Sequence, residues 1–348
     1  MNLHTSRYRI LLAAAAVLVA ACGQPAAHAT SQAYGGAHGR AADAKPSPVP
    51  PPPPPPPAEP ALPAAAAGTL PGQNLPISGP LAYPLLIQIE NTPPSRPQAG
   101  LQPASLIFQY LTESDITRFS AVYHRVPGVV GPVRSARFIT QYLYHRFDAV
   151  MMASGAGNAT LGRVFGEQGM IGGYFNDFAP SVFFRWGGRP APHNVYTRQD
   201  QMLQVAGQGL RPPMSTDVTR SDAWSGTEPA GHVDVPLLRA AFDYGAGTYS
   251  VTTDGDLQVD AIYGPIRAQS VVVMHVRQTI TNQIHDVNGA LGRDFDMNSG
   301  GPAEIYARGT VVRGRWVSPG EKLPLQFVSA AGAPVGLPPG LSWVLLDQ

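Results

Sequence analysis

The chain has 348 residues, with 24 Lys and Arg against 23 Asp and Glu, which gives a formal net charge of +1. Such a balance provides no bulk electric field that would attract nucleic acid or an anionic membrane surface. The only cysteine, Cys22, excludes an intramolecular disulfide and a cluster of thiolate metal ligands.

The first 21 residues have the features of a signal peptide. Arg7 and Arg9 form a basic flank, and the apolar run 10–21 is too short for a stable membrane-spanning helix. The run ends in Val19-Ala20-Ala21-Cys22, which resembles a bacterial lipobox, where the peptide is cleaved before a lipidated cysteine. We therefore expect a lipid on Cys22. The alternative is an ordinary secretory signal with a chance cysteine.

Residues 22–75 are predicted to be a disordered tether. They are rich in Ala, Pro, Gly and Ser and contain too few large apolar residues to form a core. The unbroken run Pro50–Pro57 favours the extended polyproline II helix, which rises roughly 3.1 Å per residue and acts as a semi-rigid spacer. The alternative is a ligand for proline-recognition modules, which an exported chain rarely meets.

Residues 76–212 combine strand and helix patterns. Apolar runs predict strands at 83–90, 105–112, 116–125 and 148–154, of which the second and third form an antiparallel hairpin. Helical spacing predicts helices over 134–147 and after the Gly155-Ala-Gly157-Asn turn as far as Gln168. The fold class is therefore α/β or α+β, with a mixed-sheet N-terminal domain that includes helices.

Residues 213–348 are predicted to be a smaller, mostly-β C-terminal domain. Helical periodicity fades, and Gly, Pro and Asp separate short β-like runs at 248–252, 270–276, 304–312 and 343–346. In this part Trp316 is expected to pack in the core, while Arg313 and Arg315 stay solvated.

The stretch Gly131-Pro-Val-Arg134-Ser135-Ala-Arg137 is the strongest candidate for a binding site. If the helix begins at Arg134, Arg134 and Arg137 lie one turn apart, and both guanidinium groups can point the same way. The first turn of a helix offers free N–H groups and a positive dipole end, which suit an anion. Arginine adds a planar bidentate donor for phosphate or carboxylate. The alternative is that both arginines pair with acids of this chain and hold a loop.

A second candidate is the stretch that contains His193 and Asn194. Pro192 fixes the approach of the chain, and Arg185 and Arg189 bracket Trp186 just upstream. A histidine near arginines loses its proton more readily and can serve as a neutral base or hydrogen-bond partner. The alternative is that His193 only caps a loop.

No motif predicts a metal site or a cofactor. The nine histidines are scattered, and neither H-E-x-x-H nor G-x-S-x-G occurs. The glycines near Gly155 nearly match a dinucleotide fingerprint but lack its last glycine, so we interpret them as a tight turn.

Four stretches, in this order and spacing, resemble the YerB-like bacterial lipoproteins, a family with N- and C-terminal domains of unknown function: Arg96–Leu101, Glu113–Phe119, Gly131–Arg137 and Ala191–Thr197. The resemblance covers about residues 83–348 and supplies no established activity. It implies a shared polar site made of Glu113, Arg118, Arg134, Arg137, Arg185, His193 and Asn194.

The sequence departs from the family pattern at two places. Gln109 stands where the family usually has an acid, and Ser114-Asp115 stands where it usually has Gly-Gly. The order of strands and arginines is also analogous to that of the LytR-CpsA-Psr phosphotransferases, although their acidic metal ligands are not evident.

These observations predict an extracytoplasmic lipoprotein that is anchored to a membrane and binds an anionic envelope ligand. The ligand class is a phosphorylated or carboxylate-bearing glycan or lipid precursor, and peptidoglycan is one candidate partner; no nucleic acid is expected. The alternatives are an envelope enzyme that acts on a glycan or polyprenyl-pyrophosphate linkage, and a scaffold for envelope enzymes. The candidate ligand-binding residues are Glu113, Arg118, Arg134, Ser135, Arg137, Arg185, His193 and Asn194.

Overall fold

The computed structural model describes residues 68–164, 181–207, 217–286 and 288–348. The signal peptide, Cys22 and most of the tether lie outside the described residues. None of the helices in the described ranges is long and apolar enough to cross a membrane.

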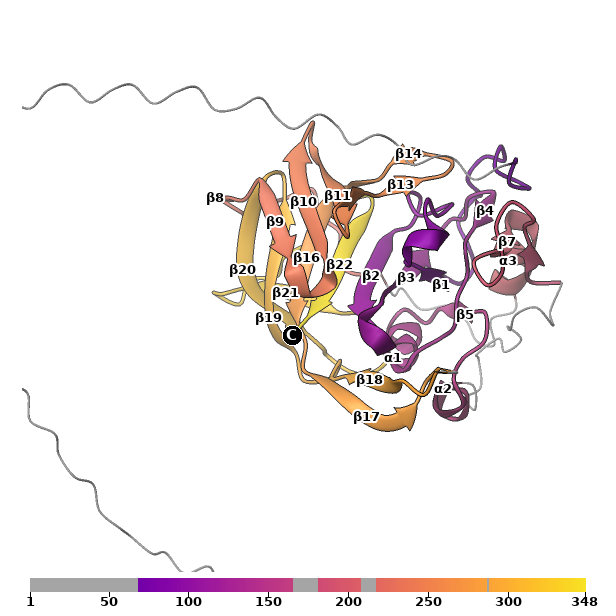
Figure 1. Ribbon diagram of the computed structural model, residues 1–348. Helices are drawn as coiled ribbons and strands as arrows, with labels where there is room; N and C mark the ends of the chain where they lie inside the picture. Colours follow the sequence, from indigo (N-terminus) through magenta and orange to yellow (C-terminus); the bar gives the residue numbers. More distant parts are fainter. Residues whose placement is uncertain (1–67, 165–180, 208–216, 287) are drawn as a thin grey trace, which may run out of the picture. The chain divides into compact units, whose positions relative to one another are not determined.

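The main element is a ten-stranded mixed sheet that crosses from the N-terminal to the C-terminal part of the chain (Figure 1). Its pairs are antiparallel except β1/β5, β16/β22 and β2/β22, which are parallel. The strands in spatial order are β21 (Gln326–Ser329), β20 (Thr310–Val317), β19 (Gly301–Ala307), β16 (Ser270–His275), β22 (Ser342–Asp347), β2 (Leu106–Leu111), β3 (Thr117–Tyr123), β1 (Leu85–Glu90) and β5 (Val150–Met152), and β8 (Glu228–Pro229) pairs with β20.

Both faces of the central strands are covered, so these strands are apolar almost throughout. Helix α1 (Phe138–Arg146) packs on one face through Ile139 and Leu143. Helix α3 (Gln199–Ala206) packs in the core of the opposite face. That core also receives apolar residues of a smaller antiparallel sheet made of β9 (His232–Val235), β10 (Ala240–Gly245), β11 (Thr248–Thr253) and β12 (Asp256–Leu257), with β15 (Arg267–Ala268) on β11.

Shorter elements surround these sheets. The remaining strands are β4 (Val129–Val130), β6 (Phe184–Arg185) and β7 (Val195–Arg198) in one small sheet, the pair β13 (Val259–Asp260) and β14 (Gly264–Pro265), and the hairpin β17 (Gln278–Ile284) and β18 (Leu291–Phe295). Within the described residues, the remaining helices are α2 (Asn158–Val164) and the 3-10 turns η1 (Pro93–Ser95), η2 (Glu113–Asp115) and η4 (Pro236–Leu238).

The mixed α/β fold class is confirmed, and strands dominate it. The predicted runs 83–90, 105–112, 116–125 and 148–154 contain β1, β2, β3 and β5, and β2 pairs with β3 in the predicted antiparallel hairpin. The run 304–312 is not one strand but parts of two. It turns at Arg308 and Gly309, which both have positive φ, and joins β19 to β20.

The predicted helix over 134–147 is wrong at its start, because α1 begins at Phe138. The backbone before it is extended and bonded to other segments instead. Arg134 N–H donates to the Gln88 carbonyl at 2.9 Å, and the Arg134 carbonyl accepts from Ser154 N–H at 2.9 Å. These long-range hydrogen bonds replace the ones that a first helical turn would make. The end of the second predicted helix, towards Gln168, lies outside the described residues.

Candidate functional site

A polar strip crosses the face of the main sheet that α1 covers. In the register of the sheet, Glu90 on β1 lies opposite Arg118 on β3, which lies opposite Tyr110 on β2. Residues that face each other across antiparallel strands project to the same side. The Tyr110 and Ser120 hydroxyl groups both lie within 2.9 Å of the Gln88 side-chain oxygen. Glu90 and Arg118 thus lie next to a buried hydrogen-bonded group made of Gln88, Ser120 and Tyr110.

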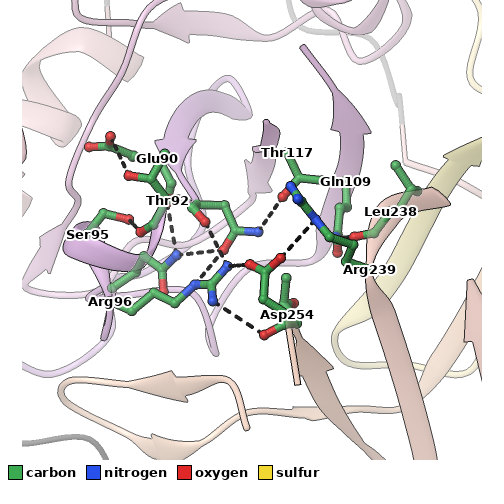
Figure 2. Close-up of polar contacts among 12 residues, drawn as sticks. Glu90, Thr92, Ser95, Arg96, Gln109, Thr117, Leu238, Arg239 and Asp254 are labelled. Atoms are coloured by element: carbon green, nitrogen blue, oxygen red, sulfur yellow. Dashed lines mark hydrogen bonds and ion pairs between the residues drawn. The ribbon is translucent and has the colours of Figure 1, made fainter. Parts of the chain in front are cut away.

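Glu90 is the centre of the first part of the site. Its side chain is 2% exposed, and three groups converge on its Oε1 atom. Thr92 Oγ1 donates to it at 2.8 Å, His193 Nδ1 hydrogen-bonds to it at 2.9 Å, and Arg134 Nε makes an ion pair at 3.3 Å. Figure 2 shows the contact with Thr92. The Oε2 atom is buried without a hydrogen-bond partner among the described residues.

Arg134 and His193 reach Glu90 because their backbones are joined to neighbouring strands. Val133 forms a bridge with Ile89 of β1, and Val133 N–H donates to the Val195 carbonyl at 2.7 Å. The turn that carries Arg134 therefore lies between β1 and the start of β7. The side chains of Arg134 and His193 remain 29% and 20% exposed, so both are available to a molecule in solution.

Arg137 and Glu113 form the second part of the site, a buried ion pair. Arg137 Nε donates to Glu113 Oε2 at 2.6 Å, and Arg137 Nη2 donates to Glu113 Oε1. Burial alone would raise the pKa of the Glu113 carboxyl. The hydrogen bonds and charge of Arg137, together with the charge of Arg118, outweigh burial and lower this pKa to about 2. Both charges are thus matched within the protein.

Arg118 lies between the two parts. Its Nη1 donates to the Ser135 carbonyl at 3.0 Å. Burial, followed by the positive charge of Arg137, lowers the pKa of Arg118 to about 9, while Glu113 and Tyr110 oppose this shift. The Ser135 hydroxyl donates to the Ser154 carbonyl at 2.9 Å, which fixes the turn.

Arg185 and Asn194 face each other across β6 and the start of β7. Arg185 is exposed, and its Nη1 donates to the buried Asn194 Oδ1 at 2.5 Å. Arg189 is buried, and its Nη2 donates to the Pro97 carbonyl at 2.6 Å. Burial lowers the pKa of Arg189, against the opposing charges of Tyr196 and Glu90. Its Nη1 has no hydrogen-bond partner among the described residues.

The structure therefore brings together some of the predicted site residues and separates others. Arg134 and His193, about sixty residues apart, meet on Glu90. The expectation that Arg134 and Arg137 point the same way is wrong, because Arg134 contacts Glu90 and Arg137 contacts Glu113. Sequence reasoning missed Glu90. The available signal was an acid at the end of an apolar strand, just before a proline-containing loop.

Gln109 lies apart from the arginines, on the other face of the sheet. Its Nε2 donates to the Leu238 carbonyl at 3.0 Å (Figure 2). Its Oε1 accepts from Trp343 Nε1 at 2.9 Å. An amide satisfies both neighbours, whereas an ionised carboxylate can only accept. The residue at this position supports the packing of the two parts of the chain against each other.

The Arg96 motif also joins the two parts of the chain. Arg96 Nη2 donates to the Asn91 carbonyl at 2.8 Å and pairs with Asp254 at 2.5 Å (Figure 2). Arg239 Nε pairs with the other Asp254 oxygen at 2.8 Å. This cluster holds the loop after Glu90 against the β11–β12 hairpin.

Comparisons with known proteins agree with the four motifs. Residues 76–210 match the N-terminal domain, and residues 234–344 the C-terminal domain, of the family described as "Protein of unknown function (DUF3048)". The Bacillus subtilis (strain 168) protein named "Putative lipoprotein YerB" is 31% identical over 248 residues, which cover 67% of this chain and 72% of that protein. A crystal structure of YerB protein from Bacillus subtilis is similar with a TM-score of 0.61 at 26% identity, over 76% of this chain and 91% of that chain. The chain therefore belongs to the DUF3048 family, and the resemblance to YerB-like proteins is confirmed.

Proposed function

We propose that this protein is an extracytoplasmic lipoprotein, anchored through Cys22, whose folded part binds an anionic envelope ligand at Glu90, Arg134 and His193. The ligand class is a phosphorylated or carboxylate-bearing glycan or lipid precursor. The lipobox and the name of the Bacillus subtilis relative support the anchor. The proline-rich composition of the tether is that of a semi-rigid spacer, which would hold the folded part away from the membrane surface.

The observation that carries the binding proposal is the incomplete set of contacts around Glu90. Arg134 Nε lies 3.3 Å from Glu90 without the geometry of a hydrogen bond, and Arg189 Nη1, a cationic donor, lacks a partner among the described residues. Unsatisfied buried polar groups cost free energy, so they mark places where another molecule can bind. The partly exposed Arg134 supplies a cation with a bidentate fork.

The buried Arg137–Glu113 pair is less suited to direct contact with an anion. Its members already satisfy each other, and a ligand would have to displace Glu113 from Arg137. We therefore assign Arg134, rather than Arg137, as the arginine of this turn that contacts the ligand.

Thermal unfolding and calorimetric titration with inorganic phosphate, pyrophosphate, glucuronate and muropeptides test the binding proposal. We expect at least one of these probes to stabilise the wild type. Arg134→Ala should weaken its binding by roughly 10- to 150-fold, because a charge-assisted hydrogen bond contributes roughly 1.5–3 kcal/mol. Arg134→Lys should bind nearly as weakly, since lysine lacks the fork.

Arg313→Ala is the matched control, because Arg313 is an exposed arginine on β20 that pairs with Glu228. It should bind the probe as the wild type does. The proposal is wrong if the wild type binds none of these probes, or if both Arg134 variants bind as tightly as the wild type.

The anchor is tested separately. Cys22→Ala should prevent lipid attachment and release the protein from membranes, because the apolar run 10–21 is too short to span a bilayer stably. Radiolabelled-lipid incorporation and membrane fractionation measure this. Membrane retention of the variant, with no acylation of the wild type, would show that Cys22 is not an anchor.

One observation favours the enzyme alternative. The hydrogen bond from His193 Nδ1 to the buried Glu90 carboxylate orients the imidazole and leaves its Nε2 atom available for acid–base chemistry. Turnover of a glycan or polyprenyl-pyrophosphate linkage by the wild type would distinguish an enzyme from a binding protein.

A further inference from the structure

The hairpin made of β17 and β18, here called the strap, lies against the N-terminal part of the structure. Figure 1 shows it running beside α1 and α2. Arg163 of α2 pairs with Asp294 of the strap at 2.7 Å, and Arg293 of the strap pairs with Asp115 of η2 at 3.1 Å. Most of β17 is exposed, whereas Phe295 at the end of β18 is buried against Tyr110 in the core. The exposed strand β17 is therefore the part of the strap most prone to local opening.

His285, directly after β17, is a buried side chain of the strap. It is 2% exposed, and its ring meets the ring of Phe138 edge-on with 4.3 Å between centroids. Its backbone lies so close to Gly157 that a Cβ there would come within 2.6 Å of the His285 carbonyl oxygen. Neither ring nitrogen has a hydrogen-bond partner among the described residues. The site that His285 occupies in the docked strap therefore favours the uncharged form of its ring.

Four charged groups act on His285 from the elements packed around it: Arg137 before α1, Glu113 of η2, Arg163 of α2 and Asp294 of β18. The two carboxylates are already bonded to the two arginines. A proton on His285 would therefore add a positive charge without a free counter-ion. Burial, and then the charge of Arg137, lower the pKa of His285.

We propose that the strap is an acid-released cover over the Glu113–Arg137 pair, with His285 as the group whose protonation releases it. This inference does not depend on the proposed function. When the strap is docked, His285 stays neutral. When the strap is detached, the ring is in water and can take up a proton, so acid favours the detached state.

The direction in which docking of the strap depends on pH follows from proton linkage. The docked ring binds fewer protons than the free ring, so docking is strongest above the ordinary histidine pKa of about 6.5 and weakens as the pH falls below it. With one proton taken up, the docking equilibrium constant should fall by up to about tenfold per pH unit. Carboxylates with ordinary pKa values of roughly 4 keep their charge down to pH 5.5, so this range isolates a histidine.

Hydrogen–deuterium exchange of the full chain at pH 7.5, 6.5 and 5.5 tests the proposal, with rates corrected for the intrinsic effect of pH. We expect protection of β17 and β18 in the wild type to fall by up to about tenfold between pH 6.5 and 5.5, while β22 keeps its protection. His285→Gln and His285→Phe should abolish this pH dependence, even if either variant docks more weakly overall. The Phe variant preserves the ring contact with Phe138.

His232→Gln is the matched control. His232 is exposed on β9 and pairs with Asp243, so its loss should leave the pH profile of the strap unchanged. The proposal is overturned if strap protection in the wild type does not change between pH 7.5 and 5.5. It is also overturned if the acid-dependent loss persists in both His285 variants.

Discussion

Arg134 and Arg137 stand three residues apart but meet different carboxylates and therefore have different roles. Arg137 is buried with Glu113 in a bidentate pair. Arg134 is partly exposed and lies at the edge of the Glu90 cluster. Taking two charges out of water is costly, and that cost is recovered only while both partners are present. Arg137 thus stabilises the fold, whereas Arg134 is held where a ligand can reach it.

This difference predicts losses of stability of different size for two alanine variants. Arg137→Ala leaves Glu113 buried and unpaired, so it should lower the free energy of unfolding by roughly 3–5 kcal/mol. Arg134→Ala leaves the buried Glu90 carboxylate with its hydrogen bonds to Thr92 and His193, and Arg134 itself is 29% exposed, so this variant should cost less, roughly 1 kcal/mol. Urea denaturation of both variants measures the two costs. Equal costs for the two variants would mean that both arginines serve the fold alone.

At the scale of the elements, strands were predictable and the start of the main helix was not. The strands β1, β2 and β3 are buried on both faces, so each appears in the sequence as a compact apolar run. The start of α1 depends on two backbone hydrogen bonds: Arg134 N–H donates to the Gln88 carbonyl, and Ser154 N–H donates to the Arg134 carbonyl. Such partners lie far away in the sequence, and local spacing does not reveal them.

The candidate site was predictable in its motifs but not in its arrangement. The motifs that contain Arg134 and His193 could be identified. Glu90 was missed because its signal, an acid at the end of an apolar strand before a proline-containing loop, does not reveal which residues it contacts. The same holds for the strap, in which nothing in the sequence links His285 to Phe138. The predicted role of the site residues in ligand binding stays a prediction until the titrations described above are made.

At the scale of the whole molecule, the main sheet runs through both parts of the family pattern. The last strand of the chain, β22, lies between β2 of the N-terminal part and β16 of the C-terminal part, parallel to both. Its residues Trp343–Leu346 are at most 1% exposed. The division at 212/213 therefore separates two stretches of sequence whose strands share one sheet.

This arrangement predicts that residues 76–212 do not fold cooperatively on their own. Without β22, strand β2 would present an unpaired, apolar edge to water, which favours aggregation over a stable monomer. Deleting residues 342–348 from the full chain should have the same effect on the N-terminal part, because it removes β22 alone. Deleting only Gln348 is the matched control, since β22 ends at Asp347.

Near-ultraviolet circular dichroism and urea unfolding distinguish the outcomes. The 76–212 fragment and the chain without 342–348 should lack fixed aromatic packing and a cooperative transition, whereas the chain without Gln348 should retain both. Co-expressing residues 213–348 should restore the fragment, because that piece supplies β22 and with it the neighbour of β2 and the Trp343 partner of Gln109. A fragment 76–212 that unfolds cooperatively alone would instead show that the N-terminal stretch is an independent domain and that β22 only extends its sheet.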